Sequence, residues 1–350
     1  MSDVKTEENE VLFSRDGVAG IITLNRPKAL NALTLNMVRA IHPQLIAWAA
    51  DETVKLVIIE ATGEKAFSAG GDIRALHDWG KAGDPKVIDF YREEYRLNAY
   101  IKSYPKPYVA LMGGIDMGGG VGVSVNGSHR VANERLVFAM PETGIGLFPD
   151  VGGTFFLPRC PGEVGMYLAL TGERLKAADA IYAGIADVFV PSDKFIDLNS
   201  ALAAGAAFGA AVKGVSADAG DASLAVLRSQ IDTHFSKSSV TEIISSLKAE
   251  GSEWSNKVVG VLAGKSPTSL RVTFRQIREG KNLSFEEAMK LEFRLTNRFM
   301  RGRDFYEGVR AIIIDKDQQP KWHPATLDGV SEAEVDAYFA SLGADELSFV

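Results

Sequence analysis

The feature that most constrains the fold of this chain is the alternation of strand-like and helical segments over its first half. The run VKLVIIEATG at 54–63 is almost continuously apolar, which is typical of a strand covered on both faces. Helical spacing of apolar residues predicts helices at 33–51 and about 85–103. The expected strands are 17–25, 54–63, 107–114 and 135–140. Because strands that alternate with helices pair in parallel through right-handed crossovers, the chain is predicted to be an α/β protein.

The second half of the chain is predicted to be largely helical. Ser266 and Pro267 have the residue types of an N-cap and a first helical position. The Ala/Gly-rich stretch at 201–222 is low in complexity, which predicts a connector. We therefore expect three parts, namely a core at 10–200, this connector, and a helical C-terminal region at 223–350.

Composition and charge argue against several functional classes. The chain has 38 Lys and Arg against 45 Asp and Glu, so no basic excess exists to neutralise nucleic-acid phosphates. No apolar stretch is long enough to predict a membrane span. Cys160 is the only cysteine and the five histidines have no ligand spacing, so neither a disulfide nor a metal site is expected. The opening residues MSDVKTEENE have neither a secretory nor a mitochondrial pattern, which predicts a cytoplasmic protein.

Two glycine-rich turns follow expected strands. EKAFSAGGDIRAL at 64–76 comes after the buried strand, and GGIDMGGGVGVSVNG at 113–127 comes after the next one. Small residues let backbone N–H groups approach a bound oxygen closely. If both turns lie at the carboxyl ends of neighbouring parallel strands, each could direct one N–H at a single oxygen and form an oxyanion hole. The alternative for the 113–127 run is a structural one, a tight turn with close helix packing.

The helix expected at about 85–103 carries an acidic residue on its apolar side. Glu94 lies four residues after Phe90 and three before Leu97, on the stripe that these residues form. An inward-facing carboxylate needs a partner or a polar ligand. The alternative is an acid at the edge of the stripe, paired with Arg92 or Lys106.

Two further acids lie in an apolar, glycine-rich run. FAMPETGIGLFPDVGG at 138–153 contains Glu142 and Asp150, eight residues apart. Two carboxyls that face one cavity can divide acid and base roles, because burial raises one pKa while hydrogen bonds keep the other group ionised. The alternative is a pair of solvated loop acids.

Together, ITLNRPKALNAL, KAFSAGGDIRAL, MGGGVG and the 138–153 run resemble the enoyl-CoA hydratase/isomerase (crotonase) family. The resemblance implies a spiral of ββα units with a helical C-terminal region. It also implies a coenzyme A thioester substrate whose carbonyl lies between the N–H groups of Gly71 and Gly119. The residues implied to lie along the CoA part are Asp72, Ile73, Arg74 and, near its phosphates or adenosine, Lys28.

One departure from the hydratase pattern sharpens the functional expectation. Gly122 stands where hydratases of this family carry their first catalytic glutamate, whereas Glu142 matches the second. Asp150 replaces a glycine of the hydratase loop. This combination, with REEY around Glu94, resembles the 3-hydroxyisobutyryl-CoA hydrolase branch. Glu94 is then implied to contact the acyl group.

That branch implies a thioester hydrolase of valine breakdown that cleaves (S)-3-hydroxyisobutyryl-CoA, with 3-hydroxypropionyl-CoA as a further candidate substrate. No cofactor is expected beyond the CoA of the substrate. The expected partner is thus an acyl-CoA, and a homo-oligomer is a further expectation. The alternatives are an enoyl-CoA hydratase or isomerase on the same scaffold and a non-catalytic acyl-CoA-binding protein.

Overall fold

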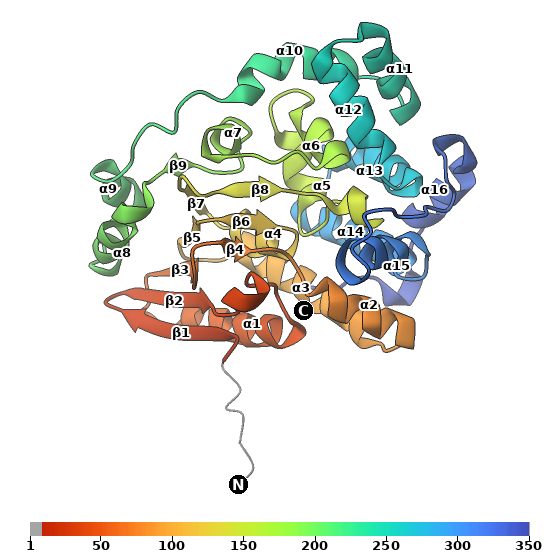
Figure 1. Ribbon diagram of the computed structural model, residues 1–350. Coiled ribbons are helices and arrows are strands. Elements are labelled where there is room, and N and C mark those ends of the chain that lie inside the picture. The colour runs from red at the N-terminus through yellow and green to blue at the C-terminus, as the bar shows by residue number, and fades with distance from the viewer. Residues whose placement is uncertain (1–8, 350) are drawn as a thin grey trace.

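The computed structural model describes residues 9–349 and contains two sheets flanked by helices (Figure 1). The larger sheet has the strand order β1-β2-β3-β5-β7-β9, and the smaller one has the order β4-β6-β8. All neighbouring strands pair in parallel except β1 and β2. The strands are β1 (Val11–Asp16), β2 (Ala19–Leu24), β3 (Leu56–Ala61), β4 (Ala66–Ser68), β5 (Tyr108–Met112), β6 (Ile115–Met117), β7 (His129–Ala132), β8 (Val137–Ala139) and β9 (Val188–Phe189).

The strands follow one another as ββα units. From β3 onward, the first strand of each pair joins the larger sheet and the second joins the smaller sheet. The predicted α/β spiral is therefore confirmed. The helices of this part are α1 (Leu35–Ala50), α2 (Ile73–Ala82), α3 (Lys86–Lys102), α4 (Gly119–Ser124), α5 (Gly153–Phe156), α6 (Val164–Thr171), α7 (Ala177–Tyr182), α8 (Phe195–Ala203) and α9 (Phe208–Lys213).

The predicted helical C-terminal half is also confirmed. Ser266 caps α13, since its hydroxyl accepts from the Ser269 amide at 3.1 Å, and Pro267 is the first helical residue. The C-terminal helices are α10 (Ser223–Phe235), α11 (Val240–Glu250), α12 (Glu253–Ala263), α13 (Pro267–Gly280), α14 (Phe285–Phe299), α15 (Asp304–Val309) and α16 (Glu332–Phe339). No helix within residues 9–349 is both long and apolar enough to cross a membrane.

Helix α3 is central to the packing that positions the site. It lies against α1, α2 and α4 of the N-terminal half and against α14 of the C-terminal half. Its buried face includes Phe90, Tyr95 and Leu97, each at most 2% exposed. The predicted stripe is thus confirmed, and it contacts helices that are distant in sequence.

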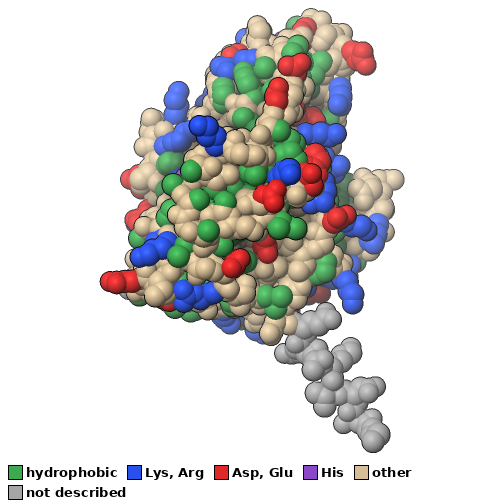
Figure 2. All heavy atoms as spheres, turned by 90° about the vertical axis from the view of Figure 1, so that its left-hand side faces the viewer, with side chains coloured by type: hydrophobic (Ala, Val, Ile, Leu, Met, Phe, Trp, Pro, Cys, Tyr) green, Lys and Arg blue, Asp and Glu red, His purple; other side chains and the backbone are tan. Residues whose placement is uncertain are grey.

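The stretch 201–222 contains the end of α8 and all of α9, followed by an extended segment that leads to α10 (Figure 1). The division into core, connector and C-terminal region stays a prediction. On the face that includes this part of the molecule, basic, acidic and apolar side chains are interspersed (Figure 2).

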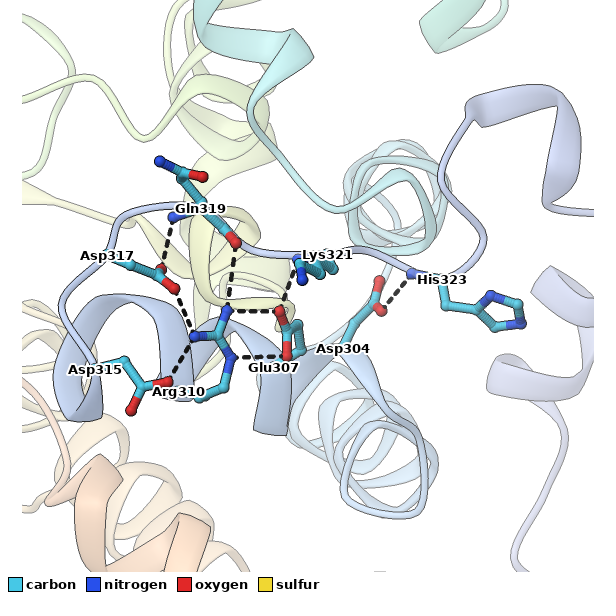
Figure 3. A network of polar contacts seen from close by, with 8 residues as sticks. All are labelled: Asp304, Glu307, Arg310, Asp315, Asp317, Gln319, Lys321 and His323. Carbon is cyan, nitrogen blue, oxygen red and sulfur yellow. Dashed lines mark hydrogen bonds and ion pairs between the residues drawn. The ribbon is translucent and has the colours of Figure 1, made fainter.

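A polar network fastens the segment after α15 (Figure 3). The Arg310 guanidinium contacts the carboxylates of Glu307, Asp315 and Asp317 at 2.7–3.0 Å. Asp304 accepts from the His323 amide at 2.9 Å and from the Ser266 hydroxyl at 2.6 Å. Because Ser266 is the N-cap of α13, the Asp304 contacts tie the C-terminal segment to this helix, which packs against the 3₁₀ turn Glu142–Ile145.

Candidate active site

The two predicted glycine turns meet at one edge of the smaller sheet. They leave neighbouring parallel strands, β4 and β6, so both follow carboxyl ends on the same side. A Cβ built on Gly119 would lie 3.1 Å from the amide nitrogen of Gly71. Leu33 holds the first turn, since its amide donates to the Gly70 carbonyl at 2.8 Å and its carbonyl accepts from the Asp72 amide at 2.9 Å. The two predicted oxyanion donors therefore lie side by side.

Glu94 extends from α3 to this pair of glycines. Its side chain is 1% exposed, and its Oε1 would lie 2.6 Å from a Cβ on Gly119. Among the described residues, Oε1 has no hydrogen-bond partner. The predicted inward orientation is confirmed. The alternative ion pair is not formed, because Lys106 donates to the carbonyls of Trp48 and Asp51 and Arg92 lies over the Phe293 ring.

Glu142 approaches the second glycine turn at Gly118. It begins the 3₁₀ turn Glu142–Ile145 and is 5% exposed. Its Oε1 would lie 3.4 Å from a Cβ on Gly118, and its Oε2 has no partner within residues 9–349. Burial raises the pKa of Glu142 well above its ordinary value, the Asp150 charge raises it further, and the Lys265 ammonium opposes both effects.

Asp150 is held by a buried hydrogen-bond chain. Its Oδ2 accepts from the Tyr95 hydroxyl at 2.7 Å, and that hydroxyl lies 2.8 Å from Thr296 Oγ1. Burial raises the pKa of Asp150 to about 6, while the Tyr95 hydrogen bond acts in the opposite direction. Burial raises the pKa of Glu94 well above its ordinary value, and the Asp150 and Glu292 charges add to this. The alternative of solvated loop acids is therefore wrong.

The backbone around Asp150 is strained and tightly held. Val151 has a φ of 49°, which costs energy for a β-branched residue. The Asn126 amide donates to the carbonyl of Val151 at 3.0 Å, and the Gln276 amide donates to that of Pro149 at 2.6 Å. The Glu292 carboxylate accepts from the amides of Gly152 and Thr154, each at 2.9 Å. These contacts fix the segment that presents Asp150.

Sequence reasoning missed Glu292, although a signal for it was present. Glu292 lies three residues after Met289 and three before Leu295, on the buried stripe of α14. It is an acid among apolar residues at helical spacing, as Glu94 is. Tyr95 and Gln276 carried no comparable signal, because Tyr and Gln are ordinary residues of a helix.

The residues implied to lie along the CoA part are partly or fully exposed, unlike the buried acids. Asp72 caps α2 by accepting from the Ala75 amide at 3.2 Å and pairs with Arg26 at 3.1 Å. Ile73 begins α2 directly after it. The Arg74 guanidinium donates to the Ile313 carbonyl at 3.2 Å, and Lys28 lies exposed in the turn Pro27–Ala29. Their binding roles stay predictions.

Comparison with known proteins identifies the scaffold. The enoyl-CoA hydratase/isomerase family model matches residues 19–339. The chain belongs to this family. A solved structure of a carnitinyl-CoA dehydratase from Mycobacterium thermoresistibile is 41% identical with a TM-score of 0.94, covering 98% of this chain and 99% of that one. An enoyl-CoA hydratase structure from Rhodobacter sphaeroides is 42% identical with a TM-score of 0.92, covering 97% of this chain and all of that one. The crotonase-like fold is thus confirmed.

Curated relatives in this family carry a different name from those structures. The 3-hydroxyisobutyryl-CoA hydrolase of Danio rerio is 53% identical, covering 97% of this chain and 91% of the relative. The human enzyme of that name is 47% identical, covering all of this chain and 93% of the relative. Both relatives bear out the expected hydrolase branch.

The same relatives correct one expectation. Both are named as mitochondrial proteins, so the expectation of a cytoplasmic protein is contradicted. That expectation rested on residues 1–10, of which residues 1–8 lie outside the described part of the chain. An acidic, polar start was therefore a poor guide to location.

Glu292 is expected to contribute strongly to stability. Glu292→Ala leaves the buried amides of Gly152 and Thr154 without their acceptor, at a cost of roughly 1–3 kcal/mol for each unpaired group. The free energy of unfolding in denaturant measures the loss. Glu286→Ala, at an exposed position of the same helix, is the matched control. If the two variants unfold alike, Glu292 does not hold the 149–154 segment.

Proposed function

We propose that this protein hydrolyses the thioester of (S)-3-hydroxyisobutyryl-CoA to 3-hydroxyisobutyrate and free CoA. The observation that carries the proposal is the meeting of the buried Glu142 and Glu94 carboxyls with the Gly71 and Gly119 turns. The hydrolase relatives, 47–53% identical, support the choice of substrate. No cofactor is required, because CoA enters as part of the substrate. A homo-oligomer stays an expectation.

The paired glycine amides would supply electrostatic stabilisation. In the proposed complex, the thioester carbonyl oxygen accepts from the N–H groups of Gly71 and Gly119. Attack on the carbonyl carbon places a negative charge on this oxygen, and preorganised donors in a water-poor site stabilise that charge strongly. The closeness of the two turns supports this role.

Glu142 would carry the attack on the thioester by one of two routes. As a general base, its carboxylate takes a proton from water while the water oxygen bonds to the carbonyl carbon. The C–S bond then breaks, and the proton on Glu142 passes to the departing CoA thiolate. As a nucleophile, it forms a mixed anhydride and releases the CoA thiolate, and water then hydrolyses the anhydride. A single turnover in ¹⁸O-labelled water separates them, because only the anhydride route can leave label in Glu142.

The environment of Gly122 disfavours the hydratase alternative. A Cβ at this position would lie 2.7 Å from Asn98 Nδ2 and 3.0 Å from Val151 Cβ. The space that a first catalytic glutamate would need is therefore filled. A hydratase of this family uses two glutamates to add water across a double bond. Here the first of these positions is Gly122, so only one of the two glutamates is present.

The proposal is tested by measuring two activities on the same CoA esters, the release of free thiol and the hydration of the double bond. Purified protein is given 3-hydroxyisobutyryl-CoA, 3-hydroxypropionyl-CoA, isobutyryl-CoA and crotonyl-CoA. We expect free thiol from the hydroxylated esters and negligible hydration of crotonyl-CoA. Hydration without thiol release would establish the hydratase alternative, and tight binding without any turnover would establish the non-catalytic one.

The pH dependence of activity should follow the ionisation of Glu142. Its pKa is raised, and only the ionised carboxylate can take a proton or attack, so kcat/KM falls as pH drops through a value well above 4.5. Asp150→Asn removes the negative charge that, after burial, contributes most to this raised pKa. The acid limb of the kcat/KM profile is therefore expected to move to lower pH. An unmoved limb would mean that another group controls it.

A further inference from the structure

Beyond Glu94, helix α3 carries a second buried polar side chain against α4. Asn98 is fully buried, and neither its Nδ2 nor its Oδ1 has a hydrogen-bond partner among the described residues. A buried amide with both ends unpaired is costly. A polar ligand that hydrogen-bonds to this amide would offset the cost.

The two polar residues of α3 are matched by two glycines of α4. Glu94 lies over Gly119, and Asn98 lies over Gly122, with Nδ2 and Oδ1 at 2.7 and 3.0 Å from a Cβ built there. Residues three and four apart share one face of a helix. Glu94 and Asn98 therefore form one polar row, and Gly119 and Gly122 form the opposing row that makes room for it.

The polar row of Glu94 and Asn98 leads away from the two glycine turns. Gly119 lies beside Gly71, where the thioester carbonyl is proposed to bind, and Gly122 lies one helical turn further along α4, roughly 5 Å of rise. Val151, the residue after Asp150, would lie 3.0 Å from a Cβ on Gly122. Asn98 is thus displaced from the carbonyl site toward Asp150.

We infer that Asn98 is a specificity-determining residue that donates a hydrogen bond to the 3-hydroxyl of the acyl group. This inference rests on the proposed function. The 3-hydroxyl lies two carbons beyond the thioester carbonyl, and the inference places the acyl chain along the row that runs from Glu94 to Asn98. A hydroxyl is one donor and two acceptor sites, whereas an ionised carboxylate only accepts. The hydroxyl donates to Glu94 or Asp150 and accepts from Asn98 Nδ2, which gives the carboxylate and the amide nitrogen one partner each.

The inference predicts a change of substrate preference. Asn98→Leu keeps the approximate size of the side chain and removes the donor, and Asn98→Ala removes it without risk of a clash. We expect kcat/KM for 3-hydroxyisobutyryl-CoA to fall roughly tenfold or more. The value for isobutyryl-CoA, which lacks the hydroxyl, is expected to change by less than about threefold. Thermal unfolding of each variant checks the fold, and Asn98→Ala serves if Asn98→Leu does not fold.

A matched control is available on α8. Asn199 is a partly buried amide whose Oδ1 has no partner in the described chain, and it bonds to Glu60 at 3.2 Å. Asn199→Leu should leave the preference unchanged. Equal losses on both esters, or an unchanged preference in the Asn98 variants, would overturn the inference. Absence of thiol release by the unmodified protein would instead refute the proposed function.

Discussion

Replacing Glu142 by glutamine is expected to abolish thiol release from 3-hydroxyisobutyryl-CoA. Glutamine has the same shape but can neither take a proton from water nor attack the thioester. Loss of a positioned general base lowers the rate by roughly 10²–10⁴-fold. The change should appear in kcat, because the residue acts on the reacting atoms and not on the CoA part. Steady-state thiol release and equilibrium binding of a CoA ester measure the two quantities separately.

The control for this variant is Glu93→Gln. Glu93 lies next to Glu94 in sequence, but it faces outward and pairs with Arg39. The Glu93→Gln variant should retain full activity. This result would show that a glutamate-to-glutamine change near α3 is tolerated in general. If Glu142→Gln keeps kcat within about tenfold of the unmodified protein, neither route through Glu142 is correct.

Local sequence patterns predicted those features of the site that are determined within a single segment of the chain. Helical spacing alone oriented Glu94, and the glycine turns were found because they follow apolar strands. Their meeting followed from topology, since adjacent parallel strands end on the same side. The resemblance to a known family then singled out Gly71 and Gly119 within those turns.

Contacts between distant segments were not predictable in the same way. Tyr95 bonds to Asp150 across 55 residues, and Glu292 reaches Gly152 across 140. No local pattern encodes the partner of a side chain, because many helices could supply one. The C-terminal helices were expected, but their role in holding the 149–154 segment was not.

Two of the short strands, β4 and β6, were missed for a different reason. They have three residues each, too few to display a period of two, whereas the strand predicted at 135–140 contains β8, Val137–Ala139. β1 has a single buried residue, so its apolar signal is weak. The smaller sheet nevertheless positions the site, because the two glycine turns follow β4 and β6.

A methyl group at Gly119 is expected to disable the oxyanion site without unfolding the protein. In Gly119→Ala the added carbon lies 3.1 Å from the Gly71 amide nitrogen, close to the distance at which an oxygen accepts from that amide. Interference with one oxyanion donor costs roughly 10²–10³-fold in kcat. Alanine is favourable within a helix, but the close contacts of the added carbon cost stability, so the melting temperature should fall while the protein stays folded.

The same carbon would lie 2.6 Å from Glu94 Oε1, so displacement of Glu94 must be separated from loss of the donor. Glu94→Ala removes the contact, and Gly119→Ala is then introduced into that background. A further large fall in kcat assigns the effect to the amides. No further fall would mean that Gly119→Ala acts only through Glu94. Gly260→Ala on α12, where an added Cβ meets no atom within 4 Å, should leave kcat unchanged.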